Sequence, residues 1–382
     1  MVNQLPQGWK EVLFNSIFDV CNSGKEKIKQ SEYLPKADGL LPVVDQGQNL
    51  VSGYSDQFQK VVLAKDNPLI VFGDHTRCVK YIDFDFVVGA DGTQLIRTKE
   101  NTLVKLGYYQ LMSANIPNNG YSRHFKYVKE QTYKLIADKG EQKYIVDTLD
   151  AVAEMIKLRK ETIQLTKDLI PAIFQEMFGN IRGSEPIKKH VIVNPRKVSL
   201  NDDVEVSFFS MADVSVDGYI LSSQRRRYSD VRNGFSSFMN DDVILAKITP
   251  CYENGKGAIV RDLINGIGFG STEFYVLRCD KQYILPEYLF YLLRSDDFME
   301  LGKCHMKGAA GQKRLDKSFL QNFGIVYPPL PLQKEFADKV EQINQNLEVQ
   351  QKDLERLQEL FDQLLQKAFT GELTRGEDYG KH

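Results

Sequence analysis

The sequence predicts an α+β protein in which two mixed α/β domains alternate with two long antiparallel helices that form a coiled coil. Three observations predict this architecture. Adding 191 to a position in 120–178 gives its counterpart in 311–369 without a gap. Each copy ends in about 40 residues whose apolar positions recur at helical spacing. At 382 residues the chain is also too long for one ordinary core. We therefore expect an internal pseudo-twofold repeat.

The repeat pairs polar as well as apolar residues, which indicates a duplicated structural unit. The paired polar and glycine positions are Gly120 with Gly311, Arg123 with Arg314, Lys126 with Lys317, Gln142 with Gln333, and Asp147 with Asp338. Further upstream, Gly89 and Thr93 can be aligned with Gly268 and Thr272 at an offset of 179. The domains are therefore expected to share a plan and to differ in detail.

Strand-like runs followed by one short aromatic helix predict the plan of each domain. In the first domain the strand-like runs are 68–72, 79–89 and 93–98, and the short helix is 107–114. In the second domain the corresponding runs are 242–248 and 272–278, and the helix is 285–294. We expect domains at 1–137 and 180–330, long helices at 138–179 and 331–371, and a tail at 372–382.

The long helices have recognisable ends and heptad patterns. Asp138 is a plausible N-cap, Pro331 opens the second helix, and Gly179 and Gly371 are suited to C-caps. Pro171 predicts a kink near Ile170. The predicted helix-to-helix contacts are Leu149, Ile156, Ile163, Ile170, Val340, Leu347, Leu354 and Phe361.

Each apolar row could alternatively pack onto its own domain. A helix of about 40 residues is roughly 60 Å long, which exceeds the face of a small domain and favours packing of the helices on each other. The first helix must deliver the chain to the second domain and the second helix leads back, so chain order predicts antiparallel helices.

Composition and charge restrict the class of protein. The five cysteines are odd in number, scattered and never in a CxxC pair, so neither a disulfide framework nor a zinc site is indicated. We expect a cytoplasmic protein, because there is no signal-peptide layout and no apolar run of about 18 residues. The formal charge of −2 hides an acidic pair of helices, since 138–179 has 6 basic and 8 acidic residues and 332–372 has 5 and 9. The remainder of the chain is modestly basic.

The layout resembles the specificity subunit of type I restriction–modification systems over essentially the whole chain. The residues that carry the resemblance are YPPLPLQKEFADKVEQI at 327–343, EQKYIVDTLDAV at 141–152 and LLQKAFTGEL at 364–373. One departure is that the first copy lacks the proline-rich start of the second long helix. The resemblance implies that each domain is a target-recognition domain reading half of a split site in double-stranded DNA. It also implies docking of two methyltransferase subunits on the helices, with restriction subunits joining through the complex.

Basic loops supply the candidate DNA contacts. Phosphates require Lys, Arg or backbone donors, and bases in the major groove require Arg, Lys, Asn, Gln or Ser on positioned loops. The loops 120–126 and 311–317 carry matching charges, although capping of the helix junction is an alternative role. The run 224–230 could instead be a solvated surface loop. The candidate DNA-contacting residues are Lys25, Lys27, Lys29, His75, Arg77, Ser122, Arg123, Lys126, Arg225, Arg226, Arg227, Lys247, Lys313, Arg314 and Lys317.

An enzyme would need chemistry that the sequence does not indicate. NGIGFG at 265–270 precedes a strand instead of opening a helix, and YPPL at 327–330 lacks the leading Asn or Asp of an adenine methyltransferase motif. His75 is more consistent with a polar contact than with catalysis. We expect no catalytic residue, metal or cofactor. Asymmetric DNA recognition is the favoured function, and a coiled-coil scaffold without DNA preference is the alternative.

Overall fold

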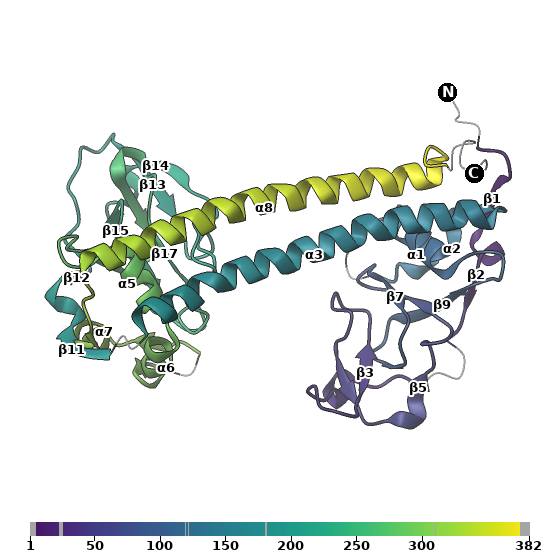
Figure 1. Cartoon of the computed structure of the whole chain (residues 1–382), viewed down its shortest axis with the longest axis horizontal. Coiled ribbons are helices and arrows are strands. Elements are labelled where there is room, and N and C mark those ends of the chain that lie inside the picture. The colour runs from purple at the N-terminus through teal and green to yellow at the C-terminus, as the bar shows by residue number, and fades with distance from the viewer. Residues whose placement is uncertain are drawn as a thin grey trace. The chain divides into compact units, whose positions relative to one another are not determined.

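The computed structural model describes residues 5–22, 26–118, 120, 122–179, 182–309 and 311–374 (Figure 1). The chain forms two compact units. Unit 1 comprises Met1–Lys160 and Lys352–His382, and unit 2 comprises Glu161–Gln351. Both units mix helices and strands, so the predicted α+β class is confirmed at that level. No helix among the described residues has both the length and the apolar content needed to cross a membrane.

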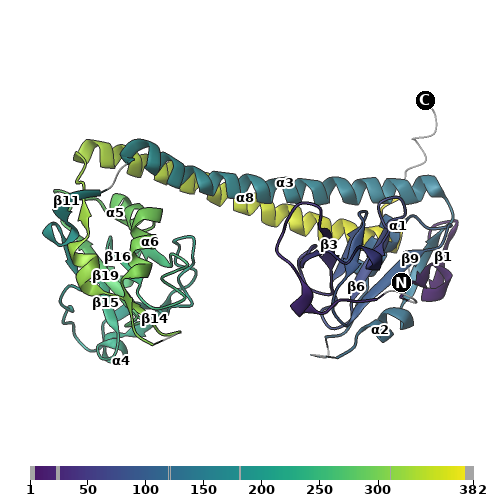
Figure 2. The same ribbon diagram turned by 90° about the horizontal axis from the view of Figure 1, so that it is seen from below.

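Unit 1 contains two four-stranded sheets and one two-stranded sheet. The sheet orders are β2-β9-β6-β7, β4-β3-β8-β5 and β1-β10, and Figure 2 shows β6 and β9 within the first of them. Its strands are β1 Trp9–Leu13, β2 Phe18–Val20, β3 Leu41–Val44, β4 Gly53–Ser55, β5 Val61–Val62, β6 Leu69–Gly73, β7 Val79–Ile82, β8 Phe86–Val88, β9 Thr93–Thr98 and β10 Thr132–Ile136. Its short helices are α1 Val104–Ser113 and α2 Phe125–Glu130.

Unit 2 repeats this strand order. The sheets are β12-β19-β16-β17, β14-β13-β18-β15 and β11-β22, with a further hairpin β20-β21. Its strands are β11 Arg182–Pro186, β12 Val191–Val193, β13 Glu205–Phe209, β14 Gln224–Arg227, β15 Ser236–Met239, β16 Val243–Ala246, β17 Gly257–Ile259, β18 Ile267–Gly270, β19 Phe274–Cys279, β20 Met306–Lys307, β21 Arg314–Leu315 and β22 Gly324–Ile325. Its short helices are α4 Tyr228–Val231, α5 Pro286–Leu292, α6 Asp296–Cys304 and α7 Lys317–Asn322.

The strand ladders correct the upstream alignment of the two copies. Gly73 pairs with Thr93 in unit 1, and Ala246 pairs with Phe274 in unit 2. The next residues donate alike, from Asp74 N–H to Gly92 O at 2.7 Å and from Lys247 N–H to Glu273 O at 2.9 Å. Thr93 therefore corresponds to Phe274, and the predicted offset of 179 was wrong by two residues. A shift of two leaves every side chain on the same face of a strand, so alternation alone could not detect it.

Both predicted long helices are present. Helix α3 runs over Lys139–Phe178 and α8 over Leu330–Thr370. Asp138 caps α3, because its Oδ1 accepts the Gly140 N–H at 2.7 Å. The glycines that follow the helices have φ of +48° at Gly179 and +88° at Gly371, the left-handed conformation that favours glycine at a helix end. Helix α3 is continuous through Pro171, and the kink there stays a prediction.

A buried glutamine explains one of the polar identities in the repeat. Gln142 Nε2 donates to Asn101 O and to Ile136 O, both at 2.7 Å, and its Oε1 accepts the Leu103 N–H at 2.9 Å. Leu103 is the N-cap of α1. The side chain thus ties the first turn of α3 to the start of the short helix.

Gln333 makes the same three contacts in unit 2. Its Nε2 donates to Tyr283 O at 2.9 Å and to Pro328 O at 2.7 Å, and its Oε1 accepts the N–H of Leu285, the N-cap of α5, at 2.8 Å. Both glutamine side chains are fully buried. An apolar residue could not satisfy these backbone groups, which accounts for glutamine in both copies.

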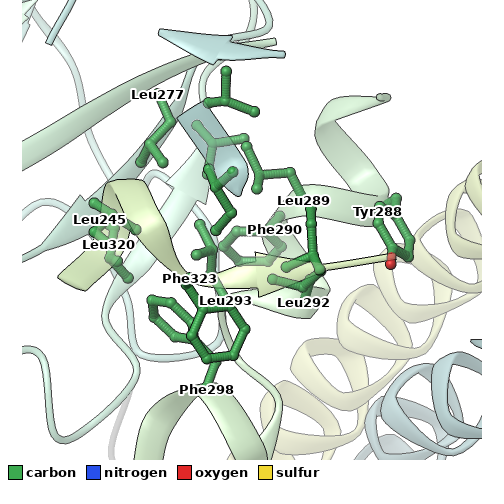
Figure 3. Close-up of a cluster of buried hydrophobic side chains, with 14 of the residues drawn as sticks. Leu245, Leu277, Tyr288, Leu289, Phe290, Leu292, Leu293, Phe298, Leu320 and Phe323 are labelled. Carbon is green, nitrogen blue, oxygen red and sulfur yellow. The ribbon is translucent and has the colours of Figure 1, made fainter. Parts of the chain in front are cut away.

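The ends of the long helices belong to the cores of the units. In unit 2, Ile170 and Phe174 of α3 and Phe336 and Val340 of α8 join one buried cluster. Figure 3 shows part of this cluster, including Leu245 of β16, Leu277 of β19 and Phe298 of α6. In unit 1 a separate cluster includes Leu149 of α3 and Leu365 of α8 with Tyr109 of α1. Each helix end therefore packs on its own unit, the alternative that sequence patterning left open.

The predicted heptad positions nearer the helix middles are also covered. Ile163, Leu347 and Leu354 are buried, whereas Ile156 is half-buried. Polar contacts accompany them within each unit. Arg159 Nη2 lies 2.9 Å from Asp353 Oδ2 in unit 1, and Gln350 Nε2 lies 3.2 Å from Thr166 Oγ1 in unit 2. In each unit, side chains of α3 therefore contact side chains of α8.

Candidate nucleic-acid interface

In unit 1, the loop after β6 holds the duplicated loop 120–126. The backbone O of Asp74 accepts the His124 N–H at 2.8 Å, and its carboxylate Oδ1 accepts the Phe125 N–H at 2.8 Å. His75 Nδ1 lies 3.1 Å from Ser122 O. Asp74 is only 4% exposed. Asp74 therefore acts as a buried support for the two residues that follow Arg123, and His75 contacts the residue that precedes it.

The basic candidates of unit 1 include Arg123 and Lys126 in this loop and Lys27 close to Arg123. The Lys27 ammonium donates to Thr93 O at 2.8 Å. Burial lowers the pKa of Lys27, Asp91 and Asp74 oppose this shift, and the positive charge of Arg123 adds to it. Arg123 and Lys126 are exposed, and the Lys126 ammonium lies 4.7 Å from the centre of the Tyr127 ring. The structure thus brings Lys27, His75, Ser122 and Arg123 into one polar group with two positive charges, those of Lys27 and Arg123.

The other candidate residues of unit 1 are Lys25, Lys29 and Arg77. Lys25 is outside the described residues. Lys29 is exposed next to a short 3-10 turn. Arg77 has φ of +62° and donates from Nη1 to Ile116 O at 3.2 Å. Its guanidinium is therefore partly engaged in holding the neighbouring backbone.

Unit 2 builds its loop in the same way. Leu315 N–H donates to Lys247 O at 2.8 Å, and Thr249 N–H donates to Lys313 O at 2.9 Å. The loop after β16 thus supports the loop 311–317 as the loop after β6 supports 120–126. Lys313 and Arg314 are exposed on it, Lys317 opens α7, and the Lys247 ammonium lies 5.4 Å from the centre of the Tyr275 ring.

A carboxylate distinguishes the second loop from the first. Arg314 Nε lies 3.0 Å from Glu273 Oε2, and its Nη2 lies 2.8 Å from Glu273 Oε1. The hydrogen bonds from Arg314 lower the pKa of the Glu273 carboxyl and raise the pKa of the guanidinium. The position that corresponds to Glu273 in unit 1 is Gly92, which has no side chain. The two duplicated arginines therefore have different electrostatic surroundings.

The arginine run at 225–227 forms strand β14 instead of a solvated loop. This strand lies at the edge of its sheet. Arg225 Nη1 pairs with Glu205 Oε2 at 3.0 Å, and the Arg226 guanidinium lies 3.7 Å from the centre of the Phe208 ring. Arg227 is exposed. Two of the three arginines are thus partly engaged by their own sheet, which reduces the free positive charge expected of the run.

Sequence reasoning missed two supporting residues, Asp74 and Glu273. Asp74 directly precedes the candidate His75, so an acidic side chain beside that residue could have signalled a support, whereas Glu273 adjoins no candidate residue in the sequence. Among the described residues, no group of three or more His, Cys, Asp or Glu side chains could hold a metal ion. The exposed basic side chains Arg123, Lys126, Lys313 and Arg314 suit contact with a polyanion.

Comparison with known proteins shows what parts of this chain resemble. Residues 196–366 match the family model described as the type I restriction modification DNA specificity domain. The chain is 36% identical over 180 residues to the type I restriction enzyme EcoAI specificity subunit of Escherichia coli, which covers 47% of this chain and 28% of that protein. It is 33% identical over 176 residues to the EcoEI specificity subunit of Escherichia coli, covering 46% and 29%. The matched region is thus less than a third of the length of these relatives.

A solved structure resembles the whole chain. The crystal structure of the type I restriction-modification system S subunit from M. genitalium superposes with a TM-score of 0.51 at 16% sequence identity. The superposition covers 96% of this chain and 98% of that one. At this identity the likeness concerns the fold.

Proposed function

We propose that the chain is a specificity subunit of the type I restriction–modification kind, which recognises a DNA sequence on behalf of partner subunits. Residues 196–366 match the DNA specificity domain of that family, and just under half of the chain is 33–36% identical to two such subunits. The observation that carries this proposal is the pair of equivalent loops, 120–126 and 311–317. Both are held by the loop after an equivalent strand, and both present basic side chains to solvent. Equivalent supports with different exposed residues suit two related readers of different sequences.

Each globular domain would then read one half of a split DNA site. The predicted domains at 1–137 and 180–330 share their strand order, which supports a pseudo-twofold arrangement. Two identical readers related in this way would select a palindrome, whereas these domains differ in sequence. We therefore expect an interrupted and asymmetric recognition site. Arg123 and Arg314, with the basic residues around them, are the proposed DNA contacts.

The long helices would act as the spacer. A coiled coil of α3 with α8 is supported by the burial of the predicted contact positions. Ile156 and Phe361 are half-buried, and the other positions are buried, namely Leu149, Ile163, Ile170, Val340, Leu347 and Leu354. Its length would set the number of base pairs between the half-sites. We propose that two modification subunits dock on this helical pair, that restriction subunits join through the complex, and that methylation and ATP-dependent cleavage reside in those partners.

Mapping of methylated DNA tests the proposal. Cells that express this chain with its modification subunits would be compared with cells that lack this chain alone, and methylated bases would be located across the genome. Loss of one split, asymmetric motif is the expected result. An unchanged map, with the complex present at equal level, would contradict the proposal and favour a scaffold without DNA preference.

A further inference from the structure

Arg314 carries most of its donors in a fixed orientation. A guanidinium has five N–H donors in a planar fork. Glu273 takes the Nε and Nη2 edge of this fork, at 3.0 and 2.8 Å, and Nη1 makes only a long contact of 3.4 Å with Gln312 O. The Arg314 side chain is nevertheless 44% exposed. The outer end of the fork, formed by Nη1 and Nη2, thus retains hydrogens that can be donated to a ligand.

The supports of this pair are rigid on both sides. Glu273 directly precedes β19, and its backbone O accepts the Lys247 N–H at 2.9 Å. Arg314 lies in β21 and also forms a β-bridge with Ile248. An arginine fixed by a carboxylate loses less side-chain entropy when it binds, and its charge is largely compensated. Such a group is better suited to a directional contact than to general attraction of phosphates.

Resting on the function proposed above, we propose that Arg314, fixed by Glu273, reads a guanine in the half-site of unit 2, whereas Arg123 contacts a phosphate in the half-site of unit 1. Guanine is the base whose O6 and N7 accept two parallel hydrogen bonds from an arginine fork in the major groove. Arg123 has Gly92 at the position of Glu273 and Lys27 close enough to repel it. Its charge therefore stays available for a phosphate.

Two conservative variants and one matched control test the assignment. The complex of this chain with its modification subunits would be titrated against a set of duplexes in which each base pair of the recognition site is changed singly. Arg314→Lys keeps the charge and removes the fork. We expect its preference at one G·C pair in one half-site to fall by about 5- to 150-fold, the value of one bidentate contact, with binding to unrelated DNA unchanged. Arg123→Lys should leave every base preference intact.

The variant Glu273→Gln tests whether the Arg314–Glu273 pair contributes to base recognition or only stabilises the fold. It frees the Arg314 charge, so binding to unrelated DNA should tighten and the salt dependence should steepen by up to about 0.9 in log K against log salt. Preference at the same G·C pair should weaken. A contact that only fastens β21 to β19 would instead give a lower unfolding temperature with both DNA properties unchanged.

The outcomes distinguish this assignment from the proposed function itself. If the wild-type complex prefers no sequence, the proposed function fails. If the wild-type complex does prefer one but Arg314→Lys and Glu273→Gln keep all base preferences, the assignment of Arg314 is wrong. Loss of preference at an A·T pair, or a loss produced by Arg123→Lys, would overturn it as well. Arg314 and Glu273 lie at the surface of their unit, and far-UV circular dichroism and thermal unfolding of each variant would verify its fold.

Discussion

The buried Gln333 should be among the most sensitive polar positions in unit 2. We consider Gln333→Leu, which keeps a similar volume and removes the amide. The replacement would leave the carbonyls of Tyr283 and Pro328 and the N–H of Leu285 without their present partner. Each unsatisfied buried group costs about 1–3 kcal/mol, and burial of the leucine offsets part of this. We expect a net loss of about 3–5 kcal/mol in the free energy of unfolding of unit 2.

The repeated architecture provides the control within the molecule. Hydrogen exchange with mass spectrometry would follow the peptide that contains Leu285 in unit 2 and the peptide that contains Leu103 in unit 1. A loss of 3 kcal/mol corresponds to about 150-fold faster exchange where exchange requires opening of that contact. Gln333→Leu should accelerate exchange at Leu285 and spare Leu103, and Gln142→Leu should do the reverse.

Exposed neighbours give the matched surface control. Lys143 and Lys334 directly follow the two glutamines and are exposed, so their alanine variants should change stability by less than about 0.5 kcal/mol. The reasoning would be refuted if Gln333→Leu left exchange at Leu285 within about threefold of wild type. It would also be refuted if both units loosened to the same extent, because each glutamine contacts only its own unit.

Three other measurements examine different forces. Phe336→Ala should destabilise unit 2 by about 3–5 kcal/mol in denaturant unfolding, because the fully buried ring packs 5.4 Å from Phe174 and 5.5 Å from Tyr291; a loss below about 1 kcal/mol would contradict the packing. Burial raises the pKa of Tyr275 to about 12. Because this folded value exceeds the ordinary value of about 10, its contribution to stability is complete below pH 10 and is lost as pH rises toward 12. Ultraviolet titration of wild type against Tyr275→Phe would detect this, and titration near pH 10 would exclude it. Arg159→Ala should cost no more than about 1 kcal/mol in thermal unfolding, since its partner Asp353 is 43% exposed, and a larger loss would point to a stronger link between α3 and α8.

The sequence predicted those elements whose residue pattern repeats over a long continuous segment. The heptad rows and their caps predicted both long helices, because a 3.6-residue pattern sustained over some 40 residues has no competing explanation. The constant offset of 191 also selected Gln142 and Gln333, although their shared role required the structure. The short strands β4, β5, β14 and β20 could not be predicted from their residues, since two to four residues carry almost no periodicity.

The sequence predicted which residues form the candidate site, but not which side chains contact one another there. Arg123 and Arg314 occupy equal positions in the repeat, so the sequence treated them alike. Glu273 lies 41 residues before Arg314, and only the fold brings the two together. The same applies to Asp74, which lies 51 residues before the Phe125 N–H that it accepts. Contacts of this kind depend on strand register, which a single sequence does not fix.

The unit whose residues leave the ribosome first is the last one that can complete its fold, because of the way in which the chain is divided between the two units. Unit 2 is one continuous stretch, Glu161–Gln351, whereas unit 1 needs the last segment of the chain as well as the first. Leu365 and Ala368 join the buried cluster around Trp9 and Leu149. During synthesis, unit 2 can therefore close its core first. Unit 1, although its residues emerge earlier, must wait with part of its apolar surface open until α8 has been translated, and this is the interval in which the nascent chain is most exposed to misassembly.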